Sequence, residues 1–179
     1  MKVVIFVSNG TEDSEYVTTR DLLRRANIEV TTLSIDEKIV KLSHGLNIIS
    51  DGLIDEYDTS DAIILPGGKV GVNNFLSNDK LLNIIREHHS LGKLTCAICA
   101  APVVLHKAGI LKNNSFTCYD GFEEGISDGC YIKKPTIRSS NVITGRSMNY
   151  TIEFALNIID YLLGDEATKR VKEGILRVD

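Results

Sequence analysis

Short apolar runs recur along the chain and alternate with segments whose apolar residues fall at helical spacing. Residues 3–7 are continuously apolar and mostly β-branched, and a polar turn follows at once. Such a run is typical of a strand buried on both faces, as in a parallel sheet. Residues 39–49 predict two short strands around a Ser43-His44-Gly45 turn. Similar runs predict strands at residues 28–33, 62–65, 94–98, 116–118, 131–133, 137–139 and 142–144.

Helices are predicted between these strands. The clearest spans residues 152–163, where apolar side chains form a continuous stripe that Gly164 closes. Strands that alternate with helices indicate βαβ units, and we therefore expect an α/β fold with a doubly wound, mostly parallel sheet and helices on both faces. No linker or repeat interrupts the pattern, so residues 1–179 are predicted to form one domain. The other helices are predicted from Ser14 to a stop at Asn27, from Asp79 to His89, from about Ala100, and from Asp165.

Composition narrows the class of protein. The chain is 43% apolar and 25% charged, carries a net charge of −4, and has no long basic run. This balance gives no reason to expect nucleic acid or an anionic membrane as a partner. No stretch reaches the roughly 18 apolar residues that span a bilayer, and residues 3–7 are too short for a secretion signal. We therefore expect a cytoplasmic protein.

Cys99 occupies the point where a predicted strand turns into a helix. The strand at residues 94–98 ends just before it, and the small residues Ala100 and Ala101 follow, with Pro102 in the first helical turn. The positive end of a helix dipole favours a thiolate, and this elbow geometry exposes a side chain at the top of a sheet. The alternative interpretation is that Cys99 is one more small buried hydrophobic residue.

The other cysteines predict no metal site and no redox dithiol. Cys96 and Cys99 are three residues apart, which in an extended strand separates their Cα atoms by about 10 Å, whereas a disulfide needs less than about 7 Å. No second cysteine pair or histidine cluster completes a zinc site. Cys96 is predicted to lie in the core, and Cys118 and Cys130 to be reduced thiols.

Two further loops are expected at the same edge of the sheet. The first carries Glu12, Asp13 and Glu15 at the start of a helix, where acids cap the helix or where one of them turns toward Cys99. The second carries Gly67 and Gly68, which form a simple turn or offer amides to an oxyanion. Neither loop has a phosphate-binding motif, so we expect no nucleotide, flavin or other cofactor.

Four segments together resemble the ThiJ/PfpI superfamily, in the branch of the Parkinson-disease-associated thiol protein and its bacterial YajL-type relatives. They keep their order and spacing over almost the whole chain. The resemblance implies a flavodoxin-like sheet and a homodimer. The segments are Gly10-Thr11-Glu12-Asp13-Ser14-Glu15, Leu65-Pro66-Gly67-Gly68, Ala97-Ile98-Cys99-Ala100-Ala101-Pro102 and Ile152-Glu153-Phe154-Ala155-Leu156.

The resemblance also implies roles for residues. It makes Cys99 the nucleophile and Glu15 its partner acid, and it surrounds the sulfur with Gly67, Gly68 and the amide of Ala100. The function implied is a cysteine-dependent defence against oxidative and carbonyl stress. The activities implied for such a protein are glutathione-independent conversion of methylglyoxal to lactate, deglycase-like repair of glycation adducts, and chaperoning. The expected partner is a small carbonyl compound or an oxidant. The alternatives are a non-enzymatic redox sensor or chaperone and, third, a hydrolase or amidotransferase relative.

The chain departs from the family pattern at three places. Ala100, not histidine, follows the cysteine, and Tyr119 stands where other members have a histidine, so a Cys-His protease dyad is disfavoured. Arg146-Ser147-Met148-Asn149 replaces the usual Arg-Gly-Pro-Gly before the long helix. Among the histidines, only His44 is predicted to neighbour the pocket, and Tyr119 is the second candidate.

Overall fold

The computed structural model describes residues 1–176 and contains a seven-stranded sheet in the order β10-β11-β7-β6-β1-β2-β5. Six strands run parallel, and β10 pairs antiparallel with β11 at one edge. The α/β fold with a mostly parallel sheet is therefore confirmed. The strands are β1 (Lys2–Val7), β2 (Glu29–Ser34), β5 (Gly52–Leu53), β6 (Ala62–Leu65), β7 (Leu94–Ile98), β10 (Thr136–Ser139) and β11 (Val142–Gly145).

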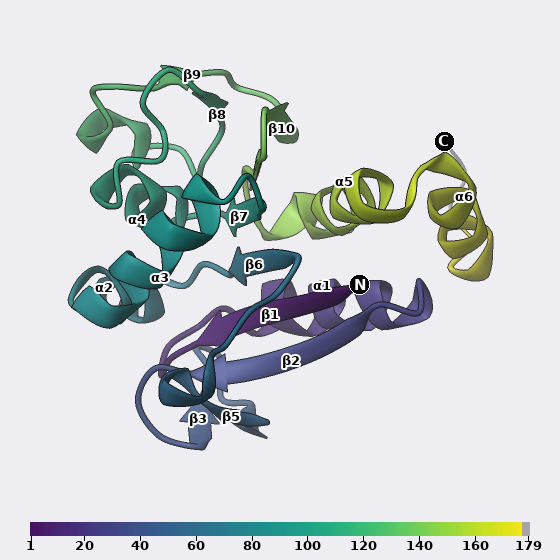
Figure 1. Cartoon of the computed structure of the whole chain (residues 1–179), viewed down its shortest axis with the longest axis horizontal. Coiled ribbons are helices and arrows are strands. Elements are labelled where there is room, and N and C mark those ends of the chain that lie inside the picture. Colours follow the sequence, from purple (N-terminus) through teal and green to yellow (C-terminus); the bar gives the residue numbers. More distant parts are fainter. Residues whose placement is uncertain (177–179) are drawn as a thin grey trace.

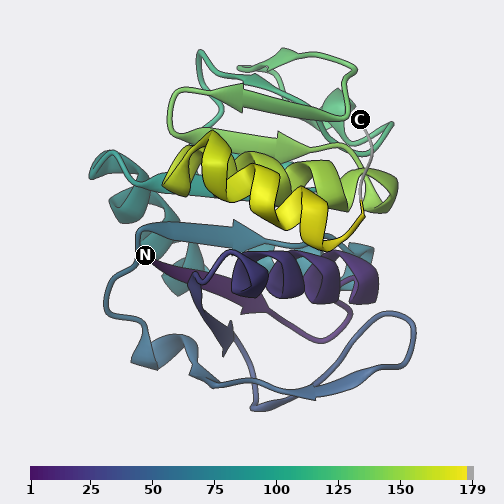
Figure 2. The same ribbon diagram turned by 90° about the vertical axis from the view of Figure 1, so that its right-hand side faces the viewer.

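Helices cover both faces of the sheet, as expected for a doubly wound fold (Figures 1 and 2). One face packs against α2 (Lys69–Leu76), α3 (Asp79–Ser90) and α4 (Pro102–Lys107), and the other against α1 (Asp13–Arg25), α5 (Thr151–Leu163) and α6 (Asp165–Gly174). Because β6 and β7 lie between the two layers, every one of their residues is buried. This explains their continuously apolar sequences.

The helix ends follow local signals in the sequence. Asn27 has a φ of 59°, the left-handed conformation that ends a helix, directly after the last turn of α1. The side chain of Asn78 caps α3 by accepting a hydrogen bond from the Leu81 amide at 2.9 Å. Gly164 separates α5 from α6 with a φ of 82°. Within residues 1–176, no helix is both long and apolar enough to cross a membrane.

Shorter elements differ from the predictions. The hairpin of β3 (Ile39–Lys41) and β4 (Asn47–Ile49) is confirmed as an antiparallel pair. The strands predicted at residues 116–118 and 131–133 are reduced to β8 (Ser115–Phe116) and β9 (Cys130–Tyr131), which form a separate parallel pair outside the main sheet. Three 3₁₀ helices were not predicted: η1 (Ile54–Glu56), η2 (Glu123–Gly125) and η3 (Met148–Tyr150).

Helix α2 was also missed, since no helix was predicted between the turn at Gly67 and Gly68 and the helix that begins at Asp79. Its sequence contains Gly71 and two asparagines, which are weak helix formers. The helix forms because Val72 and Phe75 are buried against the sheet. Tertiary packing therefore decides the structure of this segment, where local propensity is weak.

A buried histidine on α3 makes folding stability depend on pH. His88 is 3% exposed, its Nε2–H donates to the Leu94 carbonyl at 3.0 Å, and its Nδ1 accepts from the Tyr57 hydroxyl at 3.0 Å. Burial lowers the pKa of His88 from 6.5 to about 4. The unfolded chain therefore takes up this proton first, and stability is lost as the pH falls from 6.5 toward 4.

We expect acidification from pH 7 to pH 4.5 to remove about 2–3 kcal/mol of unfolding free energy through His88. Urea unfolding at both pH values measures this loss. A His88→Gln variant keeps hydrogen-bonding groups but cannot titrate, so it should show a smaller loss on acidification. Equal losses in the two proteins would mean that His88 does not cause the acid sensitivity.

Candidate active site

Three loops meet at the carboxyl edge of the sheet, where ligands bind in folds of this kind. They follow the neighbouring central strands β1, β6 and β7. The first loop leads into α1 and carries Glu15, the second carries Gly67 and Gly68, and the third begins with Cys99. The sheet order thus brings together residues that are more than 80 positions apart in the sequence.

Cys99 forms a sharp, strained turn between β7 and the next helix. Its φ is 62°, a left-handed conformation that residues with a side chain rarely adopt. Neighbouring backbone holds it in place: the Cys99 amide donates to the Gly145 carbonyl at 2.9 Å, and the Tyr119 amide donates to the Cys99 carbonyl at 2.8 Å. The elbow predicted from the sequence is therefore present, and Cys99 is half-buried rather than part of the sealed core.

Glu15 is a fully buried acid that lies beside this cysteine. Its Oε2 accepts a hydrogen bond from the Gly67 amide at 2.7 Å. Its Oε1 is also buried and makes no hydrogen bond of normal geometry within residues 1–176. The carboxyl lies close enough to the Cys99 thiol for each group to change the pKa of the other. Of the three acids in the first loop, Glu15 is thus the one directed toward the cysteine.

The absence of a side chain at Gly67 allows its backbone, the Cys99 side chain and the Glu15 carboxyl to lie in contact. A Cβ atom at this position would lie 2.7 Å from Cys99 Cβ and 2.8 Å from Glu15 Oε2, closer than real contacts allow. The resemblance placed Gly67 around the sulfur, and the structure shows that its amide donates to Glu15. The Ala100 amide acts on the thiol instead, because it lowers the pKa of Cys99.

Gly68 joins the first and second loops. Its φ is 95°, and a Cβ atom there would lie 2.2 Å from the Gly10 carbonyl oxygen and 2.7 Å from the Glu12 amide nitrogen. The Glu12 amide also donates to the Gly67 carbonyl at 2.9 Å. Only glycine fits this close approach of two backbones.

The charges of Glu15 and Cys99 are coupled. Burial raises the pKa of Glu15 to about 7. Burial raises the pKa of the Cys99 thiol as well, the neighbouring Glu15 carboxylate raises it further, and the Ala100 amide acts in the opposite direction. From the sequence we expected the helix end to favour the thiolate. The raised pKa shows that the helix end alone does not do so. A thiolate here requires Glu15 to hold the proton, because two adjacent buried anions are costly.

Comparison with known proteins identifies the family of the chain. The model of the DJ-1/PfpI family matches residues 1–161. The chain belongs to the DJ-1/PfpI family. The family resemblance and the flavodoxin-like fold expected from the sequence are thus confirmed.

Individual relatives extend the match to nearly the whole chain. DJ-1alpha of Drosophila melanogaster is 34% identical over 179 residues, which cover 97% of this chain and 82% of that protein. The crystal structure of Drosophila melanogaster DJ-1beta has a TM-score of 0.96 and 32% identity, covering 99% of this chain and 98% of that one. A Caenorhabditis elegans protein named glutathione-independent glyoxalase DJR-1.2 is 28% identical over 93% of this chain and 90% of its own length.

His44 and Tyr119, the two predicted pocket neighbours, have different surroundings in this DJ-1/PfpI protein. The His44 side chain is 72% exposed, and its Nδ1 lies 3.3 Å from Glu12 Oε2 and 3.7 Å from Asp13 Oδ2, so it contacts acids of the first loop. Tyr119 adjoins Cys99 through its backbone, and its ring is half exposed and packs edge-on against Phe122.

Within residues 1–176, each of the four histidines has partners other than Cys99. His89 bonds to Asn141, and His106 to Asp128. His88 bonds to Tyr57, and His44 to the acids of the first loop. A Cys-His protease mechanism therefore has no support among the described contacts.

One group of three side chains offers potential metal ligands within residues 1–176. Ligand atoms of Glu12, Asp13 and His44 all lie within 4.8 Å of one another. Both carboxylate oxygens of Asp13 already accept backbone hydrogen bonds, from His44 and Leu46. The spacing of cysteines and histidines in the sequence does not indicate this group, and its hydrogen bonds and ion pairs account for its geometry.

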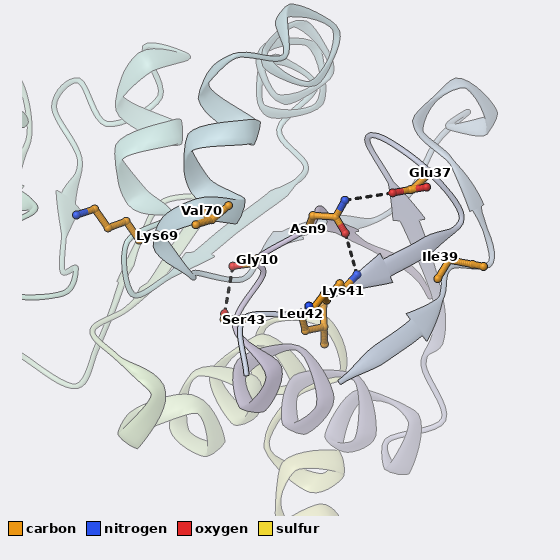
Figure 3. Close-up of a pocket in the computed structure, with 9 residues that line it drawn as sticks. All are labelled: Asn9, Gly10, Glu37, Ile39, Lys41, Leu42, Ser43, Lys69 and Val70. Carbon is orange, nitrogen blue, oxygen red and sulfur yellow. Dashed lines mark hydrogen bonds between the residues drawn. The ribbon is translucent and has the colours of Figure 1, made fainter. Parts of the chain in front are cut away.

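A cavity of about 720 Å³ lies beside the first loop and is lined by neither Cys99 nor Glu15. Figure 3 shows Asn9 between Glu37 and the Lys41 backbone, and Gly10 bonded to Ser43. These contacts fix the β3–β4 hairpin to the first loop. Nothing in the sequence pattern predicted this cavity, because the hairpin and α2 that border it come from distant segments.

Proposed function

We propose that this protein is a cysteine-dependent enzyme that converts 2-oxoaldehydes such as methylglyoxal into 2-hydroxy acids without glutathione. The observation that carries the proposal is the buried Glu15 carboxyl beside Cys99 at a strained elbow. The name of the Caenorhabditis elegans relative supports the same reaction. The wider role would be defence against carbonyl and oxidative stress, with repair of early glycation adducts as a related activity on the same thiol.

In the first step, the Cys99 sulfur bonds to the aldehyde carbon of methylglyoxal. The carbonyl π bond opens, and the thiol proton ends on the aldehyde oxygen, which gives a hemithioacetal. The Ala100 amide, which lowers the pKa of the Cys99 thiol, and the Gly68 amide are the donors proposed to stabilise the developing oxyanion.

In the second step, Glu15 moves a proton along the bound substrate. Its carboxylate takes the proton from the former aldehyde carbon and returns it to the neighbouring carbon. The hydroxyl proton of the hemithioacetal moves to the oxygen of that neighbouring carbon, so that the hemithioacetal becomes a thioester of lactate. Water then cleaves the thioester and restores the thiol. The sum is methylglyoxal plus water giving lactic acid, with no external oxidant. A pKa of about 7 suits Glu15 to this exchange near neutral pH.

Lactate production from methylglyoxal in the absence of glutathione tests the proposal. Wild type should form lactate, and Cys99→Ala should form none above the uncatalysed rate. Cys96→Ala changes a fully buried thiol on the preceding strand and serves as the matched control. Activity that survives Cys99→Ala would overturn the proposal.

A second candidate is a redox sensor or chaperone in which Cys99 is only oxidised. The unpartnered Oε1 of Glu15 favours it, since a protonated carboxyl there is a donor for a sulfinate oxygen. Peroxide would then add two oxygen atoms to Cys99, as read by mass spectrometry, while no lactate forms from methylglyoxal. The two functions are thus separated by one preparation and two assays.

We also propose that the protein forms a homodimer, which the family resemblance implies. Exposed aliphatic side chains of Val17 and Ile152 border a hollow of about 470 Å³ on the layer of α1 and α5. A second copy of the chain would cover these side chains. Light scattering at micromolar concentration should give a dimer for wild type and a monomer for Val17→Glu. A monomeric wild type would refute the proposal.

A further inference from the structure

A small polar hollow lies next to the segment that follows β11. In the sheet, β11 flanks β7 on the side opposite to β6 and β1, whose loops carry Gly67 and Glu15. The volume of the hollow is about 270 Å³. Every residue that lines it carries a side-chain hydrogen-bonding group, whereas small-molecule sites are ordinarily lined mostly by apolar groups. We call it the Arg146 hollow. Its lining residues are Tyr119, Asp120, Arg146, Ser147, Asn149 and Tyr150.

The Arg146 hollow adjoins the reactive cysteine through the backbone. The Tyr119 amide donates to the Cys99 carbonyl at 2.8 Å, and the Cys99 amide donates to the carbonyl of Gly145, the residue before Arg146. The Cys99 side chain packs against the apolar cluster that contains the buried residues of α5, and η3 (Met148–Tyr150) leads directly into that helix. The hollow therefore borders the loop that begins with Cys99, at the carboxyl edge of the sheet where β7 and β11 end side by side.

Arg146 is held in a fixed position at the wall of the hollow. Its Nε donates to Asp120 Oδ1 at 2.9 Å and its Nη2 to Oδ2 at 2.8 Å, and Lys133 binds the same carboxylate at 2.9 Å. A guanidinium has five N–H bonds, so three remain for another acceptor. A group held in advance loses little freedom when a ligand binds.

Two more side chains of the hollow have unused hydrogen-bonding capacity. Neither the Ser147 hydroxyl nor the Asn149 amide makes a side-chain hydrogen bond within residues 1–176. Methylglyoxal ends in a methyl group, which can neither donate a hydrogen bond to these side chains nor accept one from them. A ligand with several hydroxyl groups matches these donors and acceptors, because each hydroxyl both donates and accepts.

We infer that the Arg146 hollow binds the hydroxylated tail of a sugar-derived 2-oxoaldehyde while Cys99 bonds to its aldehyde carbon. The inference rests on the proposed function and names its substrate class. The covalent step is unchanged: a C–S bond forms, the carbonyl π bond opens, and the thiol proton ends on the aldehyde oxygen. Ser147 and Asn149 are specificity-determining residues that select for hydroxyl groups beyond the carbonyls.

The test compares 3-deoxyglucosone, a six-carbon 2-oxoaldehyde with a hydroxylated tail, with methylglyoxal. Each aldehyde protects Cys99 from alkylation by iodoacetamide when it forms the hemithioacetal, and peptide mass spectrometry reads the alkylation of Cys99 alone. In wild type, 3-deoxyglucosone should protect at about tenfold lower concentration than methylglyoxal, as one or two net hydrogen bonds allow. In Ser147→Ala/Asn149→Ala this preference should disappear.

A matched variant and a second assay make the result decisive. Ser77→Ala/Asn83→Ala changes exposed residues around α2 and α3 and should keep the wild-type preference. An equal preference in wild type and in the hollow variant, or none in wild type, would overturn the inference. Acid formation from both aldehydes is measured separately. Protection without acid formation would count against the proposed reaction while leaving the subsite supported.

Discussion

Glu15→Gln and Glu15→Leu should each lower lactate production from methylglyoxal at least a hundredfold, because neither side chain can carry the proton between the two substrate carbons. The two variants should differ in the thiol. Gln removes the negative charge and keeps a donor, so the pKa of Cys99 should fall below its wild-type value. Leu also removes the negative charge, but it has no hydrogen-bond donor to offset the cost of burying the Cys99 thiolate. The fall in the pKa of Cys99 should therefore be smaller. Ultraviolet absorbance of the thiolate against pH measures this order.

The same substitution predicts a change in stability with a definite sign. The folded-state pKa of Glu15 is raised from 4.5 to about 7, so its stabilising contribution is complete below pH 4.5 and is lost as the pH rises through 7. Glu15→Gln should therefore be more stable than wild type by about 2–3 kcal/mol at pH 8 and by much less at pH 5.

Glu12→Gln provides the control for both effects. Glu12 lies in the same loop, but its carboxylate contacts Ser14 and His44 and is partly exposed. We expect nearly wild-type turnover from it. Turnover that survives both Glu15 variants would show that Glu15 is only an acid in the first turn of α1.

Gly68→Ala should be among the most destabilising single substitutions in the chain. The added methyl group would meet the Gly10 carbonyl oxygen at 2.2 Å and the Glu12 amide nitrogen at 2.7 Å, and both are backbone atoms that cannot swing aside. Overpacking and a positive φ together should cost about 2–5 kcal/mol of unfolding free energy. Displacement of the first loop should also reduce turnover, because that loop leads directly to Glu15.

Gly92→Ala separates the two causes. Gly92 also has a positive φ, 73°, but nothing lies within 4 Å of its missing Cβ. Gly92→Ala should lose only the unfolding free energy that comes from the strained φ, about 1 kcal/mol, and should keep full turnover. Urea unfolding of both variants measures the difference. Equal losses at the two glycines would contradict the role of Gly68 as the contact between two loops.

The predictable part of the fold is the part that burial dominates. β7 begins and ends where the apolar run at residues 94–98 does, and α5 follows its apolar stripe to Gly164. A strand buried on both faces requires a continuous apolar run, and a helix buried along one side requires apolar residues at helical spacing, so both are visible in the sequence. Helix α2 left no such pattern, because two buried side chains, Val72 and Phe75, suffice to hold it. The short strands β8 and β9 depend on a single pairing with each other, which local sequence does not encode.

The candidate site was predictable in its members but not in its contacts. The elbow at Cys99 follows from strand, small residues and helix in sequence. The family resemblance selected Glu15 among three neighbouring acids, and the structure shows it buried. That the Gly67 amide donates to Glu15, and that His44 contacts Glu12, depends on side-chain directions across loops far apart in the sequence. The raised thiol pKa likewise comes from burial, which the helix-end argument did not include.

The left-handed backbone of Cys99 has a consequence for the evolution of the protein. A residue with a Cβ atom at a φ of 62° costs on the order of 1 kcal/mol more than glycine would. Selection for folding alone would therefore favour glycine at this position. Directed-evolution libraries that are screened only for expression or thermal tolerance should drift toward losing the thiol, so activity must be part of any screen meant to improve this protein.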